Sequence, residues 1–342
     1  MQISAAGSFS GMAFDLTATG AELNDLLAAE GLFPITAALS ANAAAVDVSG
    51  HLDMTSTGPS VEARVEVRAT NVQALAKTVD IELPDLGSLA ARGSLRGDLE
   101  TIDLVDFVGH LGTSRFEFNT TLNIAGERPL AGLTVTLDPL DVAPFLDTSS
   151  NTRKSDPNPD DGDIDFSAIL SSLDVVDADL QVGIREVLGL PIGINNVELR
   201  GQLTNGVVAL QSLGAQALGG QVAIDGRLDS RAECPELEIR ARLSEPEFAG
   251  TNAGGRASKV NLATSSCGRS LYSHRKSLHA TAELIEARPR LGGEPAPVLV
   301  QRLDLTITPG ERSRVRFSGV LADEAVEGTL TVGSLEAPVS YT

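Results

Sequence analysis

Hydrophobic and polar residues alternate along much of this chain. From Val61 to Val67 every odd position is apolar and every even position is charged. A two-residue period of this kind is typical of a β-strand with one dry face and one wet face. Similar runs, bounded by Gly, Pro, Asn or Asp, recur along the sequence. The positions that we predict to line a shared apolar surface are Val61, Val65, Val67, Leu133, Val135, Leu137, Val197, Leu199, Leu237, Ile239, Leu243, Leu303, Leu305 and Ile307.

One strand phrase occurs three times, and each copy is followed by a proline thirteen positions after its first residue. The copies begin at Val46, Phe116 and Val222, and the prolines are Pro59, Pro129 and Pro235. An alternating run follows each proline. Residues 21–27 and 71–76 each precede a further proline and predict short helices that lead into strands. Such repetition indicates an array of similar supersecondary units.

We therefore predict a mainly β fold. Repeated β-hairpin modules with short entry helices are expected to form a long curved antiparallel sheet with an apolar inner face, and helix is expected to stay below about a fifth of the chain. The predicted domains are two modules in 1–147, an acidic disordered insertion at 148–165, a third module at 166–249, a basic loop with a short helix at 250–279 and an incomplete fourth module at 280–342.

The many one-sided strands have two possible arrangements. An open sheet rarely passes about ten strands without curling or splitting. The apolar faces either close over one another as a sandwich core or curl into a trough. A trough would expose far more apolar surface than the roughly 300 to 600 Å² patch of an ordinary soluble monomer, and such an excess indicates a surface for lipid or protein.

Charge and composition restrict the chemistry. With 46 acidic and 26 basic residues, the chain carries a net charge of -20, which disfavours nucleic acid as a partner. Its four histidines and two cysteines give little material for a metal site, and we expect no cofactor. Cys234 and Cys267 are either free or paired, and their distance in the fold decides which.

Motifs of known catalytic or cation sites are weak here. A calcium loop starting at Asp156 would need Gly at its sixth position and Glu at its twelfth, where Asp161 and Ser167 stand. Ser273 and Lys276 have the S-x-x-K spacing of some acyl-transfer enzymes, but the motifs that accompany it there do not occur. We therefore expect a protein that is not an enzyme.

Residues 250–290 depart from the acidic average. They contain seven Lys or Arg against Glu283 and Glu286, a local net charge of +5. The stretch could contact a membrane surface or an acidic partner, but a solvated loop that offsets nearby carboxylates is the favoured interpretation.

Several phrases resemble one protein family. The phrase LGGQVAIDGRLD at 218–229, preceded by NGVVAL at 205–210, resembles the bacterial AsmA-like family. The segment from Asp177 to Pro191, and the stretch from Gly268 through a short helix to Ala280, fit the same family order. The resemblance covers essentially the whole chain and is carried by glycine turns and strand phrases.

The resemblance implies both a fold and a function. AsmA-like proteins are similar to the TamB and chorein-type lipid-transfer proteins, whose repeated strands form a long curved sheet with an apolar groove. The resemblance further implies a periplasmic envelope-biogenesis protein that passively transports lipid between the inner and outer membranes. Its implied partners are phospholipid acyl chains and possible envelope proteins of both membranes. The family begins with an inner-membrane helix, so we expect this chain to be an internal or truncated portion of a longer anchored protein.

A purely structural β-repeat, such as an adhesin-like stalk, is the alternative. A stalk would show shorter and stricter periods without entry helices. The three repeats here are spaced by 70 and then 106 residues, which argues against a strict solenoid.

Overall fold

The computed structural model describes residues 1–9, 12–21, 31–41, 44–55, 58–77, 84–145, 166, 170, 173–248, 253–291, 294–296 and 298–332. The predicted fold class is confirmed, because the protein is mainly β, with 73% strand and 4% helix, and the sheet is antiparallel and not closed on itself. The chain divides into two compact units. The N-terminal unit comprises 1–155 and 178–190, and the C-terminal unit comprises 156–177 and 191–342.

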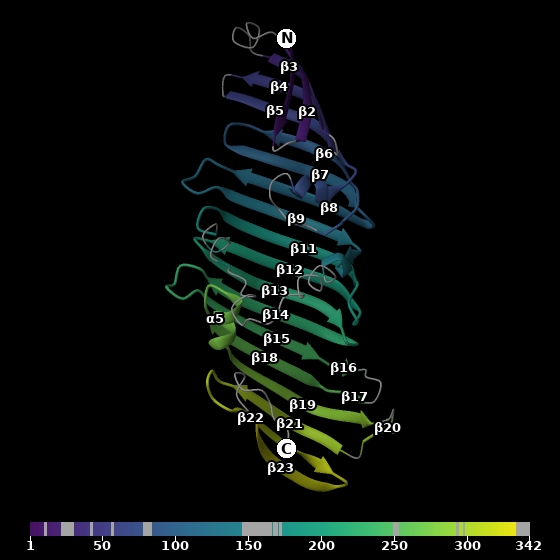
Figure 1. The fold of residues 1–342 in the computed structure, drawn as a ribbon, viewed down its shortest axis with the longest axis vertical. Helices are drawn as coiled ribbons and strands as arrows, with labels where there is room; N and C mark the ends of the chain where they lie inside the picture. Colours follow the sequence, from purple (N-terminus) through teal and green to yellow (C-terminus); the bar gives the residue numbers. More distant parts are fainter. Residues whose placement is uncertain are drawn as a thin grey trace. The chain divides into compact units, whose positions relative to one another are not determined.

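The N-terminal unit is built on a meander in which each strand from β1 to β9 pairs antiparallel with the next (Figure 1). The strands are β1 (Gln2–Phe9), β2 (Met12–Thr19), β3 (Gly31–Ala41), β4 (Ala44–Thr55), β5 (Gly58–Ala69), β6 (Leu89–Gly97), β7 (Thr101–Leu111), β8 (Ser114–Asn123) and β9 (Leu130–Asp138). After β9 the sheet continues with β11 (Asp177–Leu188), which the two-residue β10 (Leu140–Asp141) joins in parallel. Consecutive antiparallel pairing keeps almost every connection local along the chain.

The C-terminal unit repeats this plan. Its main sheet runs in the order β12, β13, β14, β15, β18, β19, β21, β22, β23, with antiparallel pairing throughout. These strands are β12 (Ile194–Thr204), β13 (Val207–Ala217), β14 (Gly220–Asp229), β15 (Glu236–Ser244), β18 (Lys259–Cys267), β19 (His279–Leu291), β21 (Val298–Ile307), β22 (Ser313–Leu321) and β23 (Glu324–Val332). A small side ladder forms where β19 runs on past the main sheet. It contains β16 (Glu247–Phe248), β17 (Ala253–Arg256) and β20 (Glu294–Pro295).

The span 250–279 differs from the prediction of a basic loop with a short helix. Besides the helix α5 (Leu271–Lys276) it contains β17 and the whole of β18, which lies inside the main sheet. The run from Lys259 to Cys267 is rich in Ser, Thr and Asn, which weakens its hydrophobic alternation. Its pairing with β15 and β19 decides its structure instead.

Within the described residues, α2 (Val72–Lys77) and α5 are short helices that lie between strands. The α2 helix agrees with the helix predicted at 71–76, and Asn71 caps it by accepting a hydrogen bond from the Ala74 backbone N–H at 2.8 Å. The helix predicted at 21–27 and the insertion predicted at 148–165 lie outside the described residues, apart from Ala21. At six residues each, α2 and α5 span only about 9 Å. Neither helix is long enough to cover a sheet face.

The repeated sequence phrase forms the same hairpin three times. Val46 pairs with Val67, Phe116 with Leu137 and Val222 with Leu243, so the partner stands 21 positions along the chain in every copy. Pro59 lies in the first ladder opposite Met54, whereas Pro129 and Pro235 come immediately before β9 and β15. The register therefore repeats with the sequence. The first hairpin stays paired closer to its turn, up to Thr55 and Gly58, whereas the last pairs of the other two are Asn123 with Leu130 and Asp229 with Glu236.

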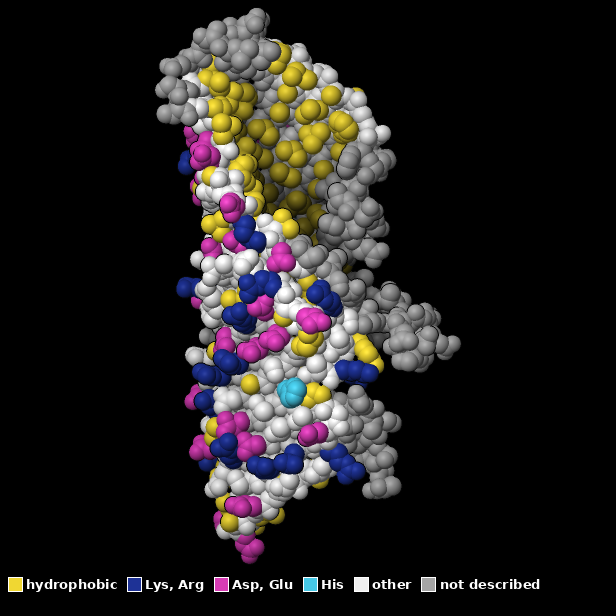
Figure 2. All heavy atoms as spheres, turned by 90° about the vertical axis from the view of Figure 1, so that its left-hand side faces the viewer, with side chains coloured by type: hydrophobic (Ala, Val, Ile, Leu, Met, Phe, Trp, Pro, Cys, Tyr) yellow, Lys and Arg dark blue, Asp and Glu magenta, His cyan; other side chains and the backbone are white. Residues whose placement is uncertain are grey.

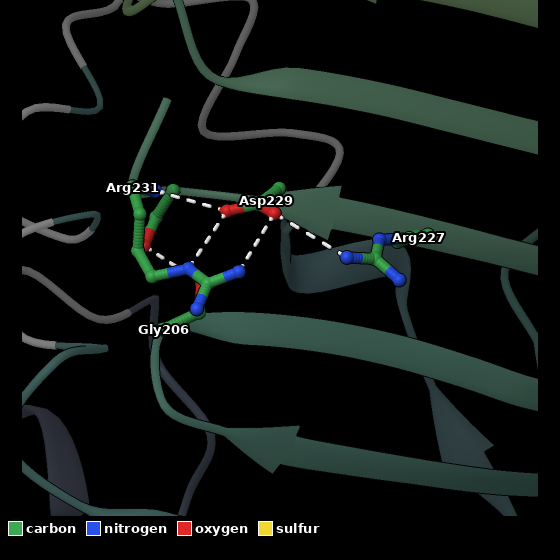
Figure 3. A network of polar contacts seen from close by, with 5 residues as sticks. Gly206, Arg227, Asp229 and Arg231 are labelled. Carbon is green, nitrogen blue, oxygen red and sulfur yellow. Dashed lines mark hydrogen bonds and ion pairs between the residues drawn. The ribbon is translucent and has the colours of Figure 1, made fainter. Parts of the chain in front are cut away.

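Two features fix the ends of the β14–β15 hairpin. Cys234, just before β15, forms a disulfide with Cys267 at the end of β18. At the end of β14, Asp229 accepts hydrogen bonds from the Arg231 guanidinium at 3.0 and 3.1 Å and from Arg227 at 3.3 Å (Figure 3). The hydrogen bonds from Arg231 are the main cause that lowers the pKa of Asp229 to about 2.

Candidate functional site

In the N-terminal unit, one face of the sheet is apolar from β1 to β9. Residues directly opposite one another in an antiparallel pair project to the same side of the sheet. One row of opposed positions runs across six strands, from β4 to β9, and consists of Val48, Val65, Gly93, Phe107, Phe118 and Val135. The parallel row through Val46 consists of Leu39, Val46, Val67 and Ala91. We call this surface the N-terminal apolar face.

No charged side chain occupies the N-terminal apolar face among the paired positions of β1–β9. Its polar side chains there are the hydroxyls of Ser114 and Thr120. The opposite face carries the charges of the alternating runs, including the pair between Arg68 and Glu66 at 2.6 Å. Such exposed ion pairs add little stability. Their effect is to keep one side of the sheet wet and leave the other dry.

The six predicted lining residues of this unit lie on the N-terminal apolar face. Val61 pairs with Leu52, and Val65 and Val67 belong to the two rows above. Leu133, Val135 and Leu137 lie opposite residues of β8 on the same side. These six residues therefore share the side of the sheet that the alternation in the sequence predicts.

The eight predicted residues of the C-terminal unit also share one face, the C-terminal apolar face. A row of nine opposed residues crosses its main sheet and consists of Leu199, Leu213, Ile224, Ala241, Leu262, Ala282, Leu305, Val315 and Leu330. Leu243 and Leu303 lie on the row beside it, joined through Val260 and Leu284. The row on the other side carries Ile239 and Ile307. Leu237 continues this face opposite Leu228, and Val197 precedes Leu199 by one strand period.

Neither apolar face is covered by a second layer of described strands or helices. Within the described part of the chain the buried hydrophobic residues are Ala63, Ala69, Phe107, Leu170, Val197, Ala217, Ala241, Ala257 and Ala280. Six of these nine are alanine, so almost no large side chain is enclosed. Large residues of the apolar faces remain exposed instead, among them Leu39 at 39% and Phe317 at 39%. Of the two predicted arrangements, the open trough therefore matches these sheets and the closed sandwich does not.

The size of the N-terminal apolar face is unusual for a soluble domain. With about five inward residues per strand, a two-residue advance of about 6.8 Å and a strand spacing of about 4.8 Å, the nine strands β1–β9 present roughly 1,500 Å². A typical monomer exposes contiguous apolar patches of roughly 300 to 600 Å². Figure 2 shows this face as a hollow lined by hydrophobic side chains. Its upper end contains a pocket of about 230 Å³ to which Phe33, Ile35, Val48 and Leu52 contribute.

Aromatic side chains fill the middle of the N-terminal apolar face. The rings of Phe107 and Phe118 stack with their centres 4.8 Å apart, and Phe116 lies 6.0 Å from Phe118. The ring of Phe107 lies against Gly93, where a Cβ atom would collide with it. A glycine on the neighbouring strand thus gives the ring room to lie along the sheet. The surface stays smooth despite its large residues.

The sequence did not identify every residue of the apolar faces. Phe107 and Leu213 were missed because β-bulges interrupt the alternation near them, at Asp106 in β7 and between Leu210 and Leu213 in β13. The positive φ of Asp106, 54°, marks the first bulge. An Asp flanked by apolar residues in the run LVDFV is the signal that could have indicated a bulge there.

The other candidate groups have structural roles. The Ser273 hydroxyl donates to the Ser270 carbonyl at 2.8 Å and takes part in the capping box at the start of α5, while Lys276 lies over the Tyr272 ring. His51 lies 3.7 Å from Glu62 on the polar side of the sheet. In the basic stretch, Arg256 and Arg290 both pair with Glu247, which fits the interpretation of a stretch that offsets carboxylates.

Neither a cation site nor a membrane-crossing helix is found within the residues that the structure describes. No three His, Cys, Asp or Glu side chains gather there in a way that could hold a metal ion. None of the described helices has the length and apolar character needed to cross a bilayer.

Comparisons with known proteins give no relative. No protein-family model, no curated protein and no solved structure matches this chain. The fold and the two apolar faces are therefore the basis for the function proposed below.

Proposed function

We propose that the protein carries lipid acyl chains along its apolar sheet faces and works as an AsmA-like lipid-transfer protein of the bacterial envelope. The observation that carries this proposal is the N-terminal apolar face, which is free of charge over the paired positions of nine strands and lies open to one side. An exposed face of roughly 1,500 Å² costs free energy in water until apolar material covers it. Acyl chains match its chemistry over its whole length.

The open side of the hollow suits an amphipathic cargo. A lipid whose chains lie on the apolar face can keep its headgroup in water at the rim, so no polar group needs to be buried. Smooth rows of Val, Leu, Ile, Ala and Phe offer no fixed polar contact that would hold one lipid in place. Movement along such a surface needs no chemical step, and the membranes that supply and accept lipid would set its direction.

The disulfide supports the proposed compartment. Cys234 and Cys267 are the two cysteines of the chain, and they are paired. Disulfides persist in oxidising compartments such as the bacterial periplasm and are rare in the cytosol. A periplasmic location is therefore part of this proposal.

A charge placed on the apolar face tests the proposal. The wild-type protein is expected to crosslink to a photoactivatable phospholipid in vesicles, and Val65→Asp to lose most of this crosslinking. Ser49→Asp is the matched control, because Ser49 is next to Val48 in β4 but lies on the opposite face, across from Arg64. It adds the same charge to the wet side and is expected to crosslink like wild type. Ile239→Asp gives the same test on the C-terminal apolar face.

A second pair of variants, Leu133→Asp and Thr134→Asp, keeps the test informative if Val65→Asp unfolds. Leu133 is already 36% exposed, so an aspartate there can stay hydrated while it interrupts the apolar surface. Leu133→Asp is expected to melt close to the wild-type temperature and to lose crosslinking, whereas Thr134→Asp on the other face retains it. Absence of lipid on the wild-type protein, or undiminished crosslinking in folded Leu133→Asp, would contradict lipid transfer. Either result would favour a structural β-repeat.

A further inference from the structure

The polar face of the C-terminal unit, opposite its apolar face, contains a hollow of about 770 Å³. It extends over five neighbouring strands of the main sheet, from β15 through β18, β19 and β21 to β22. In the view of Figure 2, Lys and Arg side chains are plainly visible over the strands of this unit. We call this hollow the arginine trough.

The floor and the rims of the arginine trough have different side chains. One row of opposed residues across the five strands consists of Arg240, Ala263, Thr281, Thr306 and Arg314. Its three middle members are short, and its two ends are long and cationic. On the next row Arg242 and Arg316 again occupy the two ends. Four strand spacings of about 4.8 Å separate the rims, which gives a width of about 19 Å.

The trough is cationic in a protein that is strongly acidic. Seven Lys or Arg residues line it, against three Asp or Glu, whereas the whole chain has a net charge of -20. The acidic Glu283 and Asp304 both pair with one arginine, Arg302, at 2.9 Å. Glu283 also accepts a hydrogen bond from Asn261 at 2.7 Å. The carboxylates of Glu283 and Asp304 therefore already have partners on the floor of the trough.

Most cations of the trough are not neutralised in this way. Within the described residues no ion pair involves Arg242, Lys259, Arg312, Arg314 or Arg316. Arg240 approaches Asp225 and Glu238 only at 4.0 and 3.9 Å. Clustering of like charges without counter-ions costs free energy, and an anion bound between the rims would offset that cost.

We propose that the arginine trough binds a compact anion with two or more phosphate groups. The planar guanidinium donates paired hydrogen bonds that match phosphate oxygens, and arginines on both rims can engage separate phosphates of one molecule. The trough is concave and about 19 Å wide, and one row of its floor carries only the short side chains of Ala263, Thr281 and Thr306. A flat bilayer would meet the rims and leave the floor empty, so a soluble anion fits this shape better.

Titration calorimetry with inorganic tripolyphosphate tests the proposal at low and at physiological salt. The wild-type protein is expected to bind, and Arg240→Gln combined with Arg314→Gln to weaken binding at least roughly tenfold, since a hydrogen bond to a charged group contributes about 1.5 to 3 kcal/mol. Both arginines are exposed, so the variant is expected to melt like wild type. Arg64→Gln combined with Arg92→Gln removes the same charge from the polar face of the N-terminal unit and is expected to leave binding unchanged.

Two outcomes would overturn the proposal. Tripolyphosphate that does not bind the wild-type protein excludes the site, and equal weakening of binding by the two double variants means attraction by net charge alone. If tripolyphosphate does not bind, sedimentation with vesicles of phosphatidylglycerol and phosphatidylcholine tests the alternative, because binding to these vesicles would assign the trough to a membrane surface. A negative result with tripolyphosphate would not contradict lipid transfer, because the lipid-crosslinking test concerns the apolar faces and the phosphate test concerns the polar face of the C-terminal unit.

Discussion

The backbone N–H of Asp106 donates a hydrogen bond of 2.7 Å to Oδ1 of Asn119 on the neighbouring strand. This contact holds the β-bulge of β7, where the register shifts between Leu104 and Phe107. The bulge turns Asp106 away from the apolar face and Phe107 onto it. One hydrogen bond on the wet side of the sheet therefore helps to keep the dry side free of charge.

Removal of that acceptor tests its role. Asn119→Ala is expected to lower the free energy of unfolding by about 1 kcal/mol, because the Asp106 N–H exchanges its partner for water. Urea denaturation measures the change. Thr134→Ala, at the position opposite Asn119 on β9, is the control and is expected to cost less. Equal losses in both variants would mean that the hydrogen bond does not hold the bulge.

Gly93 provides a second test, since its missing side chain makes room for Phe107. Gly93→Ala would force the Phe107 ring from its stack with Phe118, and we expect a loss of about 1 to 3 kcal/mol from overpacking. Thermal unfolding monitors the effect. In Gly132→Ala the new Cβ meets only the Thr121 carbonyl oxygen, at 3.9 Å, so this control is expected to be close to neutral. If the two alanine variants melt alike, the ring does not depend on Gly93.

Because of the disulfide, we expect the stability of the protein to fall in reductant. Cys234 and Cys267 are 33 positions apart, and loop-closure entropy gives a stabilisation of about 3 to 4 kcal/mol for a loop of that length. Reduction is expected to lower the melting temperature of the wild-type protein. The double variant Cys234→Ser with Cys267→Ser is expected to melt at the lower temperature with or without reductant. A wild-type melt that reductant leaves unchanged would contradict this prediction.

The lowered pKa of Asp229 leads us to expect that the free energy of unfolding depends on pH. Its folded pKa of about 2 lies below the ordinary value of about 3.9, chiefly because of hydrogen bonds from Arg231. A lowered carboxyl pKa stabilises the fold above the ordinary value, and this contribution disappears as pH falls from about 4 to about 2. Asp229→Asn is therefore expected to be less stable than wild type at neutral pH and to converge with it near pH 2.

Asp225→Asn serves as the control for this measurement, because it makes the same charge change four positions earlier in β14. Its nearest cation, Arg240, is 4.0 Å away, so a smaller effect at neutral pH is expected. Denaturant unfolding at several pH values compares the two. A difference between wild type and Asp229→Asn that does not change with pH would contradict the role of the Asp229 carboxylate.

The sequence alone determined the class of fold and the face of most strands. In runs such as 61–67 the two-residue period admits only one assignment of dry and wet sides, because a shift by one residue would expose every valine and bury every charge. The threefold phrase likewise determined the hairpin register, since the repeated residues are paired at the same separation, 21 positions, in every copy. Within each unit, the predicted lining residues share one face of the sheet for these reasons.

Only the tertiary structure decided the rest. The bulges at Asp106 and at 211–212 reverse the alternation and depend on partners in other strands, which a local pattern does not contain. β18 is a strand because β15 and β19 flank it, although its own residues are mostly small and polar. The arginine trough brings together Arg240 and Arg314, which are 74 positions apart, through four strand pairings. Long-range pairing places such residues on the two rims of one hollow, and no period of the sequence encodes it.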